Sequence, residues 1–235
     1  MKRARVLVLA LLCAFFVVPA TAGSASASDP ASVVLTSDKS IYVAGQTGTF
    51  TSQITATNLD WTLSVQYPGE SATTWHYVQV AANTNDTTIR TSLAMNYNMT
   101  VRSELTDPTN GNAVVASVTV DVPVRASIGT QAAGAQYVSH GYVVYRRGAS
   151  PRFTSSTYPA FPGYRCLRHV VQRKYAAGWR NVRTSACLVE QKQGKVPWTW
   201  SGRHPSGVKF RVRGVFAGDA ANRYNASAWT YFRFK

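Results

Sequence analysis

Cys166 and Cys187 are the residues whose type and spacing most readily suggest chemistry. They lie in the stretch RCLRHVVQRKYAAGWRNVRTSAC, residues 165–187, which carries six Lys or Arg residues and no carboxylate. Two cysteines 21 positions apart, with neither a CxxC spacing nor paired histidines, do not make a zinc site. In an oxidising compartment an isolated pair is most simply one disulfide. The stretch is therefore predicted to be stapled scaffold first and a binding surface second.

The N-terminus predicts that oxidising compartment. A basic start precedes an apolar run from Val6 to Val18, and the small-residue stretch ATAGSASAS follows. This is the layout of a secretory signal peptide, expected over residues 1–27 with cleavage after Ala22 or Ala27. The run, which contains the third cysteine, Cys13, is shorter than the roughly 20 residues of a membrane span. We expect a secreted protein, extracellular or associated with the cell wall, with no transmembrane segment.

No pattern indicates catalysis. The sequence lacks GxSxG, HExxH, phosphate-loop and dinucleotide fingerprints, and no pair of carboxylates suggests a glycosidase site. Asp219, in FAGDAAN, is expected to bond the backbone of its own turn. The histidines show no ligand spacing and are expected at the surface or filling cavities: His76, His140, His169 and His204. We expect no catalytic residue, no metal and no cofactor, with an extracellular hydrolase as a minor alternative.

Charge divides the chain into two halves. Residues 28–125 carry four basic and eight acidic residues, a balance of −4, whereas residues 126–235 carry 18 basic and two acidic ones, a balance of +16. With three basic residues near the N-terminus, −4, +16 and +3 give the formal net charge of +15. Such asymmetry indicates a polyanionic partner for the basic half. We predict two domains, 28–125 and 126–235, with a small-residue linker near residues 122–134 and a second domain that folds alone.

Both halves have the pattern of all-β domains. Short runs rich in Val, Thr and aromatic residues alternate with turns such as YPGES and DPTNGN, and no window shows a convincing helical period. About seven short strands per hundred residues is typical of a β-sandwich. The fold class predicted is therefore two tandem antiparallel β-sandwich domains after a cleaved signal peptide.

A family resemblance agrees with this fold. The segment FRVRGVFAGDAANRYNASAWTYF, residues 210–232, looks like the end of bacterial Ig-like repeats, and VVLTSDKSIYVAGQTGTFTSQI, residues 33–54, is similar to their opening. Over residues 31–235 the chain resembles secreted Ig-like proteins of Gram-positive actinobacteria. The resemblance implies a sandwich with an extracellular role in adhesion, spacing or presentation, and it implies no shared chemistry. The usual Ig disulfide spans a much wider sequence spacing than this pair does.

The two cysteines fit a hairpin. If residues 170–175 and 178–182 pair around Ala176 and Ala177, the numbers of facing residues sum to 353, and Cys166 faces Cys187. That position is expected to be non-hydrogen-bonded, with Cα atoms about 4.5 Å apart, near the lower end of the disulfide range; a bulge would relieve the fit. Closing a loop of about 20 residues contributes roughly 3 kcal/mol in the chain-entropy model.

Alternation in the last two strands predicts a basic outer face. In VKFRVR, residues 208–213, apolar residues alternate with cations, so the two kinds of side chain point to opposite faces of the strand. In WTYFRF, residues 229–234, Phe232 and Phe234 are assigned to the core, which leaves Trp229, Tyr231 and Arg233 on the outer face. Consecutive strands usually neighbour each other, so these two are expected to share a face. Predicted polyanion-binding residues are Lys209, Arg211, Arg213, Trp229, Tyr231 and Arg233, all exposed, and predicted core residues are Val208, Phe210, Val212, Phe232 and Phe234. A solvated charged face with aromatic padding is the alternative, and Val196, Trp198 and Trp200 are expected to pack in the core.

The leading functional hypothesis is a secreted, non-enzymatic Ig-like protein. Its basic domain would associate with an anionic cell-wall polymer or polysaccharide, or with another extracellular polyanion. The alternatives are a carbohydrate-binding module that uses exposed Trp and Tyr, and a spacer or protein-interaction domain with an extracellular protein partner. Polyanion binding should fall steeply with salt, whereas sugar stacking should not. Replacing Lys209, Arg211 and Arg213 by Ser should weaken polyanion binding and leave thermal stability nearly unchanged. A physiological nucleic-acid partner is not expected.

Overall fold

The chain is an all-β protein, as predicted. The structure, a computed structural model, describes residues 31–85, 87–161, 163 and 165–235. The predicted signal peptide, residues 1–27, lies outside the described residues. Within them, regular structure consists of strands and two single-turn 3₁₀ helices, η1 (Pro108–Asn110) and η2 (Lys192–Gly194). The turn predicted at DPTNGN is confirmed, because η1 lies there and ends at Gly111 with a positive φ of 60°.

The N-terminal half forms one β-sandwich. Its strands are β1 (Val33–Ser37), β2 (Tyr42–Val43), β3 (Gln46–Ile54), β4 (Leu59–Gln66), β5 (His76–Thr84), β6 (Thr88–Met95), β7 (Met99–Asp107), β8 (Ala113–Val122) and β9 (Val124–Arg125). One sheet has the order β1-β3-β6 and the other β5-β4-β7-β8, all antiparallel. The short strands β2 and β9 pair in parallel.

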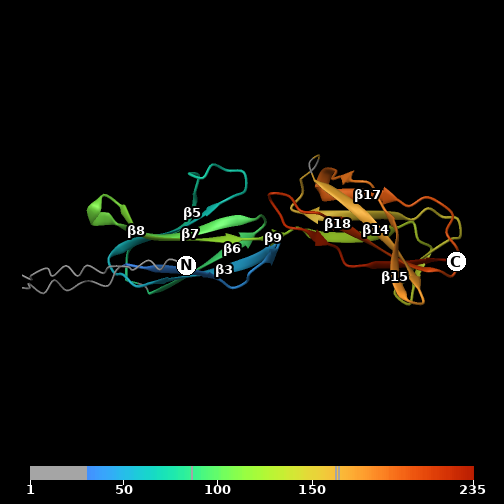
Figure 1. The fold of residues 1–235 in the computed structure, drawn as a ribbon, viewed down its shortest axis with the longest axis horizontal. Helices are drawn as coiled ribbons and strands as arrows, with labels where there is room; N and C mark the ends of the chain where they lie inside the picture. The colour runs from blue at the N-terminus through green and yellow to red at the C-terminus, as the bar shows by residue number, and fades with distance from the viewer. Residues whose placement is uncertain (1–30, 86, 162, 164) are drawn as a thin grey trace, which may run out of the picture.

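The C-terminal half forms a second β-sandwich. Its strands are β10 (Ser127–Ala133), β11 (Tyr137–Ser139), β12 (Tyr142–Tyr145), β13 (Arg152–Tyr158), β14 (Cys166–Tyr175), β15 (Gly178–Thr184), β16 (Leu188–Val189), β17 (Lys195–Thr199), β18 (Lys209–Phe216), β19 (Asn225–Ala226) and β20 (Thr230–Phe234). One sheet has the order β10-β13-β17 and the larger one β11-β12-β20-β18-β14-β15. The pairing of β12 with β20 is parallel. The two sandwiches lie end to end (Figure 1).

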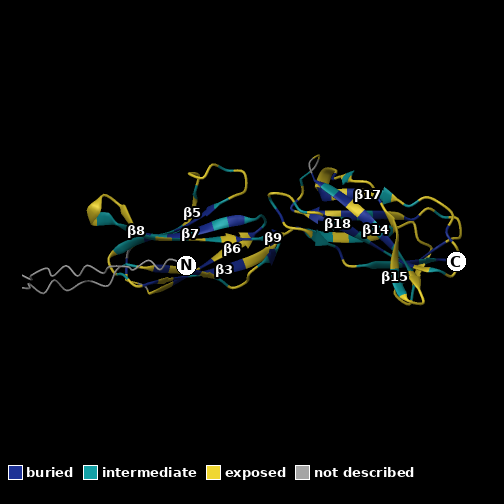
Figure 2. Ribbon diagram, in the orientation of Figure 1, coloured by how far each residue is buried: buried dark blue, intermediate teal, exposed yellow. Residues whose placement is uncertain are grey.

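Alternating burial explains why these segments are strands with one face inward. Along β7, Met99, Val101, Ser103 and Leu105 are buried, and the residues between them are not. The same alternation of dark blue with lighter segments is visible on β14 and β18 (Figure 2). Period-two burial is the pattern of a strand with one face on a core. The buried indole of Trp61 donates from Nε1 to Ser103 Oγ at 2.8 Å, so the core of the first sandwich leaves this polar group satisfied.

The core of the second sandwich contains the aromatic residues predicted for it. Phe210, Val212, Phe232 and Phe234 are at most 3% exposed, and Val208 is partly buried against them. Trp198 and Trp200 also pack on this cluster, and Val196 is buried in a neighbouring one. These core predictions are therefore confirmed. Strands β18 and β20 are antiparallel neighbours, as expected of consecutive strands.

The predicted small-residue linker near residues 122–134 is in large part a strand. Residues 127–133 form β10, which pairs along its length with β13, a strand that the sequence analysis missed. Strand β10 approaches β18 closely: Thr130 Oγ1 accepts from the amide of Gly214 at 2.9 Å, and a side chain at Gly214 would lie 3.0 Å from the same oxygen. The predicted linker is therefore mostly an ordered strand of the second sandwich, which also contacts the opposite sheet.

A polar joint connects the two sandwiches. Ladder pairing among the described strands stays within each half, apart from one isolated bridge between Arg125 and Arg223. Asn98 of the first half donates from its amide and its side chain to the backbone of the 220–221 segment, at 2.7 and 2.9 Å. From the other side Asn222, fully buried, donates to the carbonyl of Asn96 at 3.0 Å. Hydrogen bonds therefore run across the joint in both directions, while independent folding of the second domain stays a prediction.

A buried cation braces the loop that makes this joint. Arg165 is 2% exposed and donates to Asp219 Oδ2 at 3.2 Å, to Asn222 Oδ1 at 2.8 Å and to the carbonyl of Pro159 at 2.7 Å. Asp219 Oδ1 accepts from the amide of Asn222 at 2.8 Å, so the predicted turn role of Asp219 is confirmed. The carboxylate has a second role that the sequence analysis missed, because it also compensates the charge of Arg165.

The predicted disulfide between Cys166 and Cys187 is present, with Cα atoms 5.5 Å apart. Near the turn the hairpin has the predicted register, since Tyr175 pairs with Gly178 and Lys174 with Trp179. The prediction that the cysteines face each other is wrong. A bulge in β15, where Val182 is left without a partner opposite the Val171–Gln172 step of β14, shifts the register by one, and further along Cys166 pairs with Val189 of β16.

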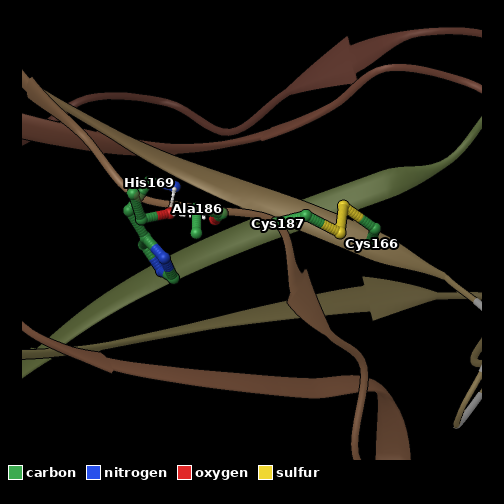
Figure 3. The surroundings of a disulfide bond; sticks show 5 residues. Cys166, His169, Ala186 and Cys187 are labelled. Atoms are coloured by element: carbon green, nitrogen blue, oxygen red, sulfur yellow. Dashed lines mark hydrogen bonds between the residues drawn. A yellow bond between two sulfur atoms is a disulfide. The ribbon is translucent and has the colours of Figure 1, made fainter.

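Cys187 instead follows Ala186 in the segment between β15 and β16, from which its sulfur reaches back to β14 (Figure 3). Two hydrogen bonds fix this segment: the amide of His169 donates to Ser185 Oγ at 2.9 Å, and the amide of Ser185 donates to the carbonyl of His169 at 2.9 Å. The disulfide therefore clips the end of the hairpin to the sheet across the register shift.

Candidate anion-binding face

The structure brings the six predicted polyanion-binding residues to one side of the larger sheet. Lys209 pairs with Arg233, and Arg211 pairs with Tyr231, across β18 and β20. Between these pairs, Phe210 and Phe232 face each other on the core side. Arg213 continues the outer row of β18, and its guanidinium carbon lies 4.4 Å from the ring centroid of Trp229, just before β20. The predicted alternation of buried and outward-facing residues is observed along both β18 and β20.

Arginine and tryptophan side chains alternate in a stack on this side. The guanidinium of Arg211 lies 4.6 Å from the ring centroid of Trp179 and 4.2 Å from that of Trp229. Trp229 in turn contacts Arg213. Distances below about 6 Å are those of attractive cation–π contacts. The order is therefore Trp179, Arg211, Trp229, Arg213, contributed by β15, β18 and the segment before β20.

Tyrosines continue the surface toward β12. Tyr231 makes edge contacts with Trp179 and Tyr142, with ring centroids 5.7 and 5.8 Å apart. The ammonium of Lys209 lies 5.5 Å from the ring centroid of Tyr142. We call the six predicted residues, together with Trp179 and Tyr142, the stacked face. Its members come from four separate segments of the chain, and the sheet order places them together.

The side chains of the stacked face are less exposed than predicted. Lys209 is exposed, but the other five predicted residues are half-buried. Arg211 is further held by Gln172, whose Oε1 accepts from its Nε at 2.8 Å and from its Nη2 at 2.6 Å. The arginines are covered because aromatic rings pack on the faces of Arg211 and Arg213 and the amide of Gln172 covers one edge of Arg211. The structure thus argues against the expectation that replacing Lys209, Arg211 and Arg213 would leave stability unchanged.

Internal carboxylates do not neutralise this half. Among the described residues of 126–235, Arg165 is the one cation in an ion pair, with Asp219. Glu190, the other acid, is buried, and its Oε1 accepts from Thr157 Oγ1 at 2.6 Å and from the amide of Phe161 at 3.1 Å. Both acids therefore have structural partners away from the stacked face, which leaves its positive charge uncompensated by the protein.

A buried serine–histidine pair lies between the two sheets. His169 Nε2 is 3.0 Å from Ser155 Oγ, and Ser155 Oγ is 2.8 Å from Thr130 Oγ1. Both His169 and Ser155 have no exposed surface, and His169 stacks on Trp198 with ring centroids 5.3 Å apart. Burial lowers the pKa of His169 to about 4, so the imidazole is neutral near pH 7. A catalytic triad needs an accessible serine and a carboxylate on the second imidazole nitrogen; here that nitrogen, Nδ1, has no partner.

The other histidines divide as the sequence suggested, into surface and cavity-filling positions. His204 is 8% exposed and packs on Trp200 and Phe234, with ring centroids 4.0 and 4.6 Å apart. Burial lowers its pKa, and the carbonyl of Trp200 opposes that shift. The half-exposed side chain of His76 lies beside Glu70, with its Nε2 2.8 Å from Glu70 Oε1. The described residues contain no cluster of three or more His, Cys, Asp or Glu able to hold a metal.

Sequence reasoning missed the partners that complete the stacked face. Trp179 of β15, Tyr142 of β12 and Gln172 of β14 are distant in sequence from β18 and β20. Trp179 did carry a signal, because the predicted hairpin placed it opposite Lys174 on one face. The position of β12 beside β20 follows from a parallel pairing, which no local pattern encodes.

Comparison with known proteins finds only distant structural neighbours. No family model matches the chain, and no curated protein matches it. A DUF4785 family protein from Legionella pneumophila is 13% identical with a TM-score of 0.35, over 84% of this chain and 54% of that one. Fibronectin(III)-like modules of Clostridium thermocellum CbhA are 12% identical with a TM-score of 0.26, over 86% and 94%. The chain thus spans about half of the Legionella protein, and such distant likenesses carry no argument about function.

The class of protein is accordingly defined by the fold itself: a chain of tandem β-sandwiches of the Ig-like type, with one disulfide in the second. Across the part of the chain that is described, we find no helix with the length and apolar character that crossing a membrane requires. A disulfide is compatible with an oxidising, extracellular compartment.

Proposed function

We propose that this protein is a secreted, non-enzymatic Ig-like protein whose basic half binds an anionic polymer of the cell envelope through the stacked face. The observation that carries the proposal is the convergence of Lys209, Arg211, Arg213 and Arg233 on one side of a sheet. Neither acid of that half compensates them, since both Glu190 and Asp219 are used elsewhere. An external anion is the natural complement of such a surface.

The stacking favours a polymer over a small anion. Rings on the planar faces of Arg211 and Arg213 leave only guanidinium edges to donate outward, and of these the Nε–Nη2 edge of Arg211 is already used by Gln172 and Arg213 Nε is buried. Each such contact with an exposed anion contributes little by itself, about 0.2–1 kcal/mol. Useful affinity therefore needs several contacts along one ligand, which a repeating anionic chain supplies.

The sugar-stacking alternative is weaker at this face. A sugar ring would need an aromatic surface free of other groups, but Trp229 already contacts two guanidiniums, and Trp179 contacts Arg211 and Tyr231. A role as a spacer requires no ligand and predicts no effect of charge removal, so the same experiment separates it from polymer binding.

The test compares two charge-matched variants. Lys209→Ser with Arg233→Ser removes two cations of the stacked face and spares the Arg–Trp stack. Arg152→Ser with Lys195→Ser removes two exposed cations from the opposite sheet. Binding to purified wall teichoic acid is measured between 50 and 500 mM NaCl. At about 0.5 kcal/mol per contact, the first variant should bind roughly fivefold more weakly at low salt and depend less on salt. Equal binding by both variants would refute the assignment.

A further inference from the structure

A cleft lies at the junction of the two sandwiches, away from the stacked face. It has a volume of about 310 Å³ and is lined by the turn after β4, the start of β7, the end of β8 and, from the C-terminal half, Arg223. Small-molecule sites start at roughly 300 Å³ and occur preferentially at domain interfaces. The size and place of this cleft are therefore those of a site for a ligand of one or two rings.

The cleft has one aromatic lining residue, Tyr67, and beside it lies a second, more aromatic hollow. That hollow, about 230 Å³, is lined by Tyr67, Pro68, Tyr97, Phe161 and Ala221, and it shares Tyr67 and Pro68 with the cleft. The rings form a chain, with centroids 6.3 Å apart for Tyr67 and Tyr97 and 5.7 Å apart for Tyr97 and Phe161. Both halves of the protein contribute, since Phe161 belongs to the C-terminal one. The Tyr67 ring also contacts that of His76, with centroids 5.4 Å apart, but Tyr67 remains 37% exposed, and the exposed part of its ring is the surface on which a sugar can stack.

The cleft is also lined by polar groups, two of which, Arg223 and Asp121, have unused hydrogen-bonding capacity. Arg223 is exposed, and its guanidinium has no hydrogen bond or ion pair among the described residues. Asp121 accepts from Thr100 Oγ1 at 2.7 Å through one oxygen, which leaves the other oxygen available. Glu70 is held by the amide of Tyr67 and by His76. The guanidinium donors of Arg223 and the carboxylate acceptors of Asp121 and Glu70 therefore line the same cleft as the ring of Tyr67.

We propose that this junction cleft binds an uncharged sugar residue of a glycan. A pyranose has C–H faces that stack on aromatic rings and hydroxyl groups that hydrogen-bond to carboxylates and guanidinium. The two carboxylates, Glu70 and Asp121, outnumber the single cation, so the cleft does not favour the anionic polymer assigned to the stacked face. The site is separate from the proposed function and would stand if that function failed.

The cleft is built before any ligand arrives. Asn98 fixes one side of it, because its Oδ1 accepts from the amide of Val124 at 2.8 Å while its Nδ2 holds the carbonyl of Ala220 at 2.9 Å. The amide of Arg223 donates to the carbonyl of Val124 at 2.8 Å, which places Arg223 at the rim. A ligand would not have to order this backbone framework, although it would order the exposed side chain of Arg223, and a preorganised framework loses less affinity to ordering.

The test titrates the full mature chain with four neutral probes: cellohexaose, chitohexaose, maltohexaose and mannohexaose, in 0.5 M NaCl. The salt screens charge–charge attraction and should leave this binding unchanged. Backbone NMR shifts should move at Gly69, Glu70, Asn98 and Arg223 with at least one probe. If no probe causes shifts there, the proposal is overturned.

Variants then assign the site. Tyr67→Ala removes the ring shared by both hollows and should weaken binding about tenfold, in line with aromatic stacking energies, and Arg223→Gln should weaken it several-fold. Tyr77→Ala is the matched control, because Tyr77 is 68% exposed on β5 and lies outside the cleft. Binding that survives both cleft variants, with circular dichroism unchanged, would overturn the assignment. The Lys209→Ser, Arg233→Ser variant should bind the sugar normally, which keeps this result distinct from that of the stacked face.

Discussion

The contact between Arg213 and Trp229 provides a direct test of the stacked face as a stabilising structure. The guanidinium carbon lies 4.4 Å from the ring centroid, and Arg213 Nε has no hydrogen-bond partner in the described structure. Coupling between the two side chains is therefore dominated by the stack itself. Partly buried cation–π contacts contribute about 1 kcal/mol. Arg211 is a poorer choice, since it also contacts Trp179 and Gln172.

A double-mutant cycle measures this coupling. Arg213→Met keeps the aliphatic stem and should cost about 1 kcal/mol, whereas Trp229→Leu loses the contacts to both arginines and should cost about 2 kcal/mol or more. The double variant should lose about 1 kcal/mol less than the sum of the single losses. Urea unfolding of the oxidised mature chain is followed through the indole NMR signal of Trp198, which reports the second sandwich by itself.

A control cycle pairs Trp229→Leu with Arg152→Met on the opposite sheet. Those two changes should add within about 0.5 kcal/mol, as distant sites do. If the coupling of Arg213 with Trp229 is no larger than in this control, the stack contributes nothing to stability. The reasoning that Arg211 and Arg213 are structural as well as ligand-binding would then be refuted.

Three further outcomes are expected. Burial lowers the pKa of His169 from its ordinary 6.5 to about 4. As the pH drops from about 6.5 towards 4, the unfolded chain therefore binds a proton before the folded chain does, and the free energy of unfolding falls by up to about 3 kcal/mol. His169→Gln should flatten the curve of unfolding free energy against pH in that window, and an unchanged curve would contradict the assignment. Gly194→Ala should destabilise the protein by more than about 2 kcal/mol, because φ is +70° and the added carbon would lie 2.5 Å from the carbonyl oxygen of Thr157. The control Gly207→Ala, with φ +76° and open space around the added carbon, should cost only about 1 kcal/mol. Equal losses of stability in thermal unfolding would argue against the tight contact at Gly194. Mass mapping of the non-reduced protein should find Cys166 linked to Cys187, and replacing both by Ser should cost roughly 3 kcal/mol; free thiols at both positions would rule the bond out.

Alternation of residue types carried most of the fold and the outline of the candidate face. Because side chains on a strand alternate between two sides, VKFRVR was enough to separate Phe210 and Val212 from Arg211 and Arg213. The same argument identified Tyr231 and Arg233 as neighbours of those arginines, and the pairing of β18 with β20 is the observed one.

Features that depend on non-local geometry could not be predicted in this way. The bulge in the hairpin shifts the register by one partway along β14, and β16 then replaces β15 as its partner, so counting residues from the turn gave the wrong partner for Cys166. The burial of the stacked face depends on Trp179 and Tyr142, which reach it from other strands. Small residues of β10 looked like a linker because composition does not show that Thr130 must approach Gly214.

The polar joint has a consequence for how the molecule moves in solution. Asn98 of the first sandwich and Asn222 of the second each donate hydrogen bonds to the other sandwich. Arg165 hydrogen-bonds to Asn222 and so braces the connecting loop. Two freely hinged bodies would each reorient at the rate set by their own size, but sandwiches fixed end to end (Figure 1) rotate as one elongated particle. Nuclear spin relaxation should then report a single anisotropic diffusion tensor for both halves. A polymer bound to either half would reorient with the whole elongated molecule.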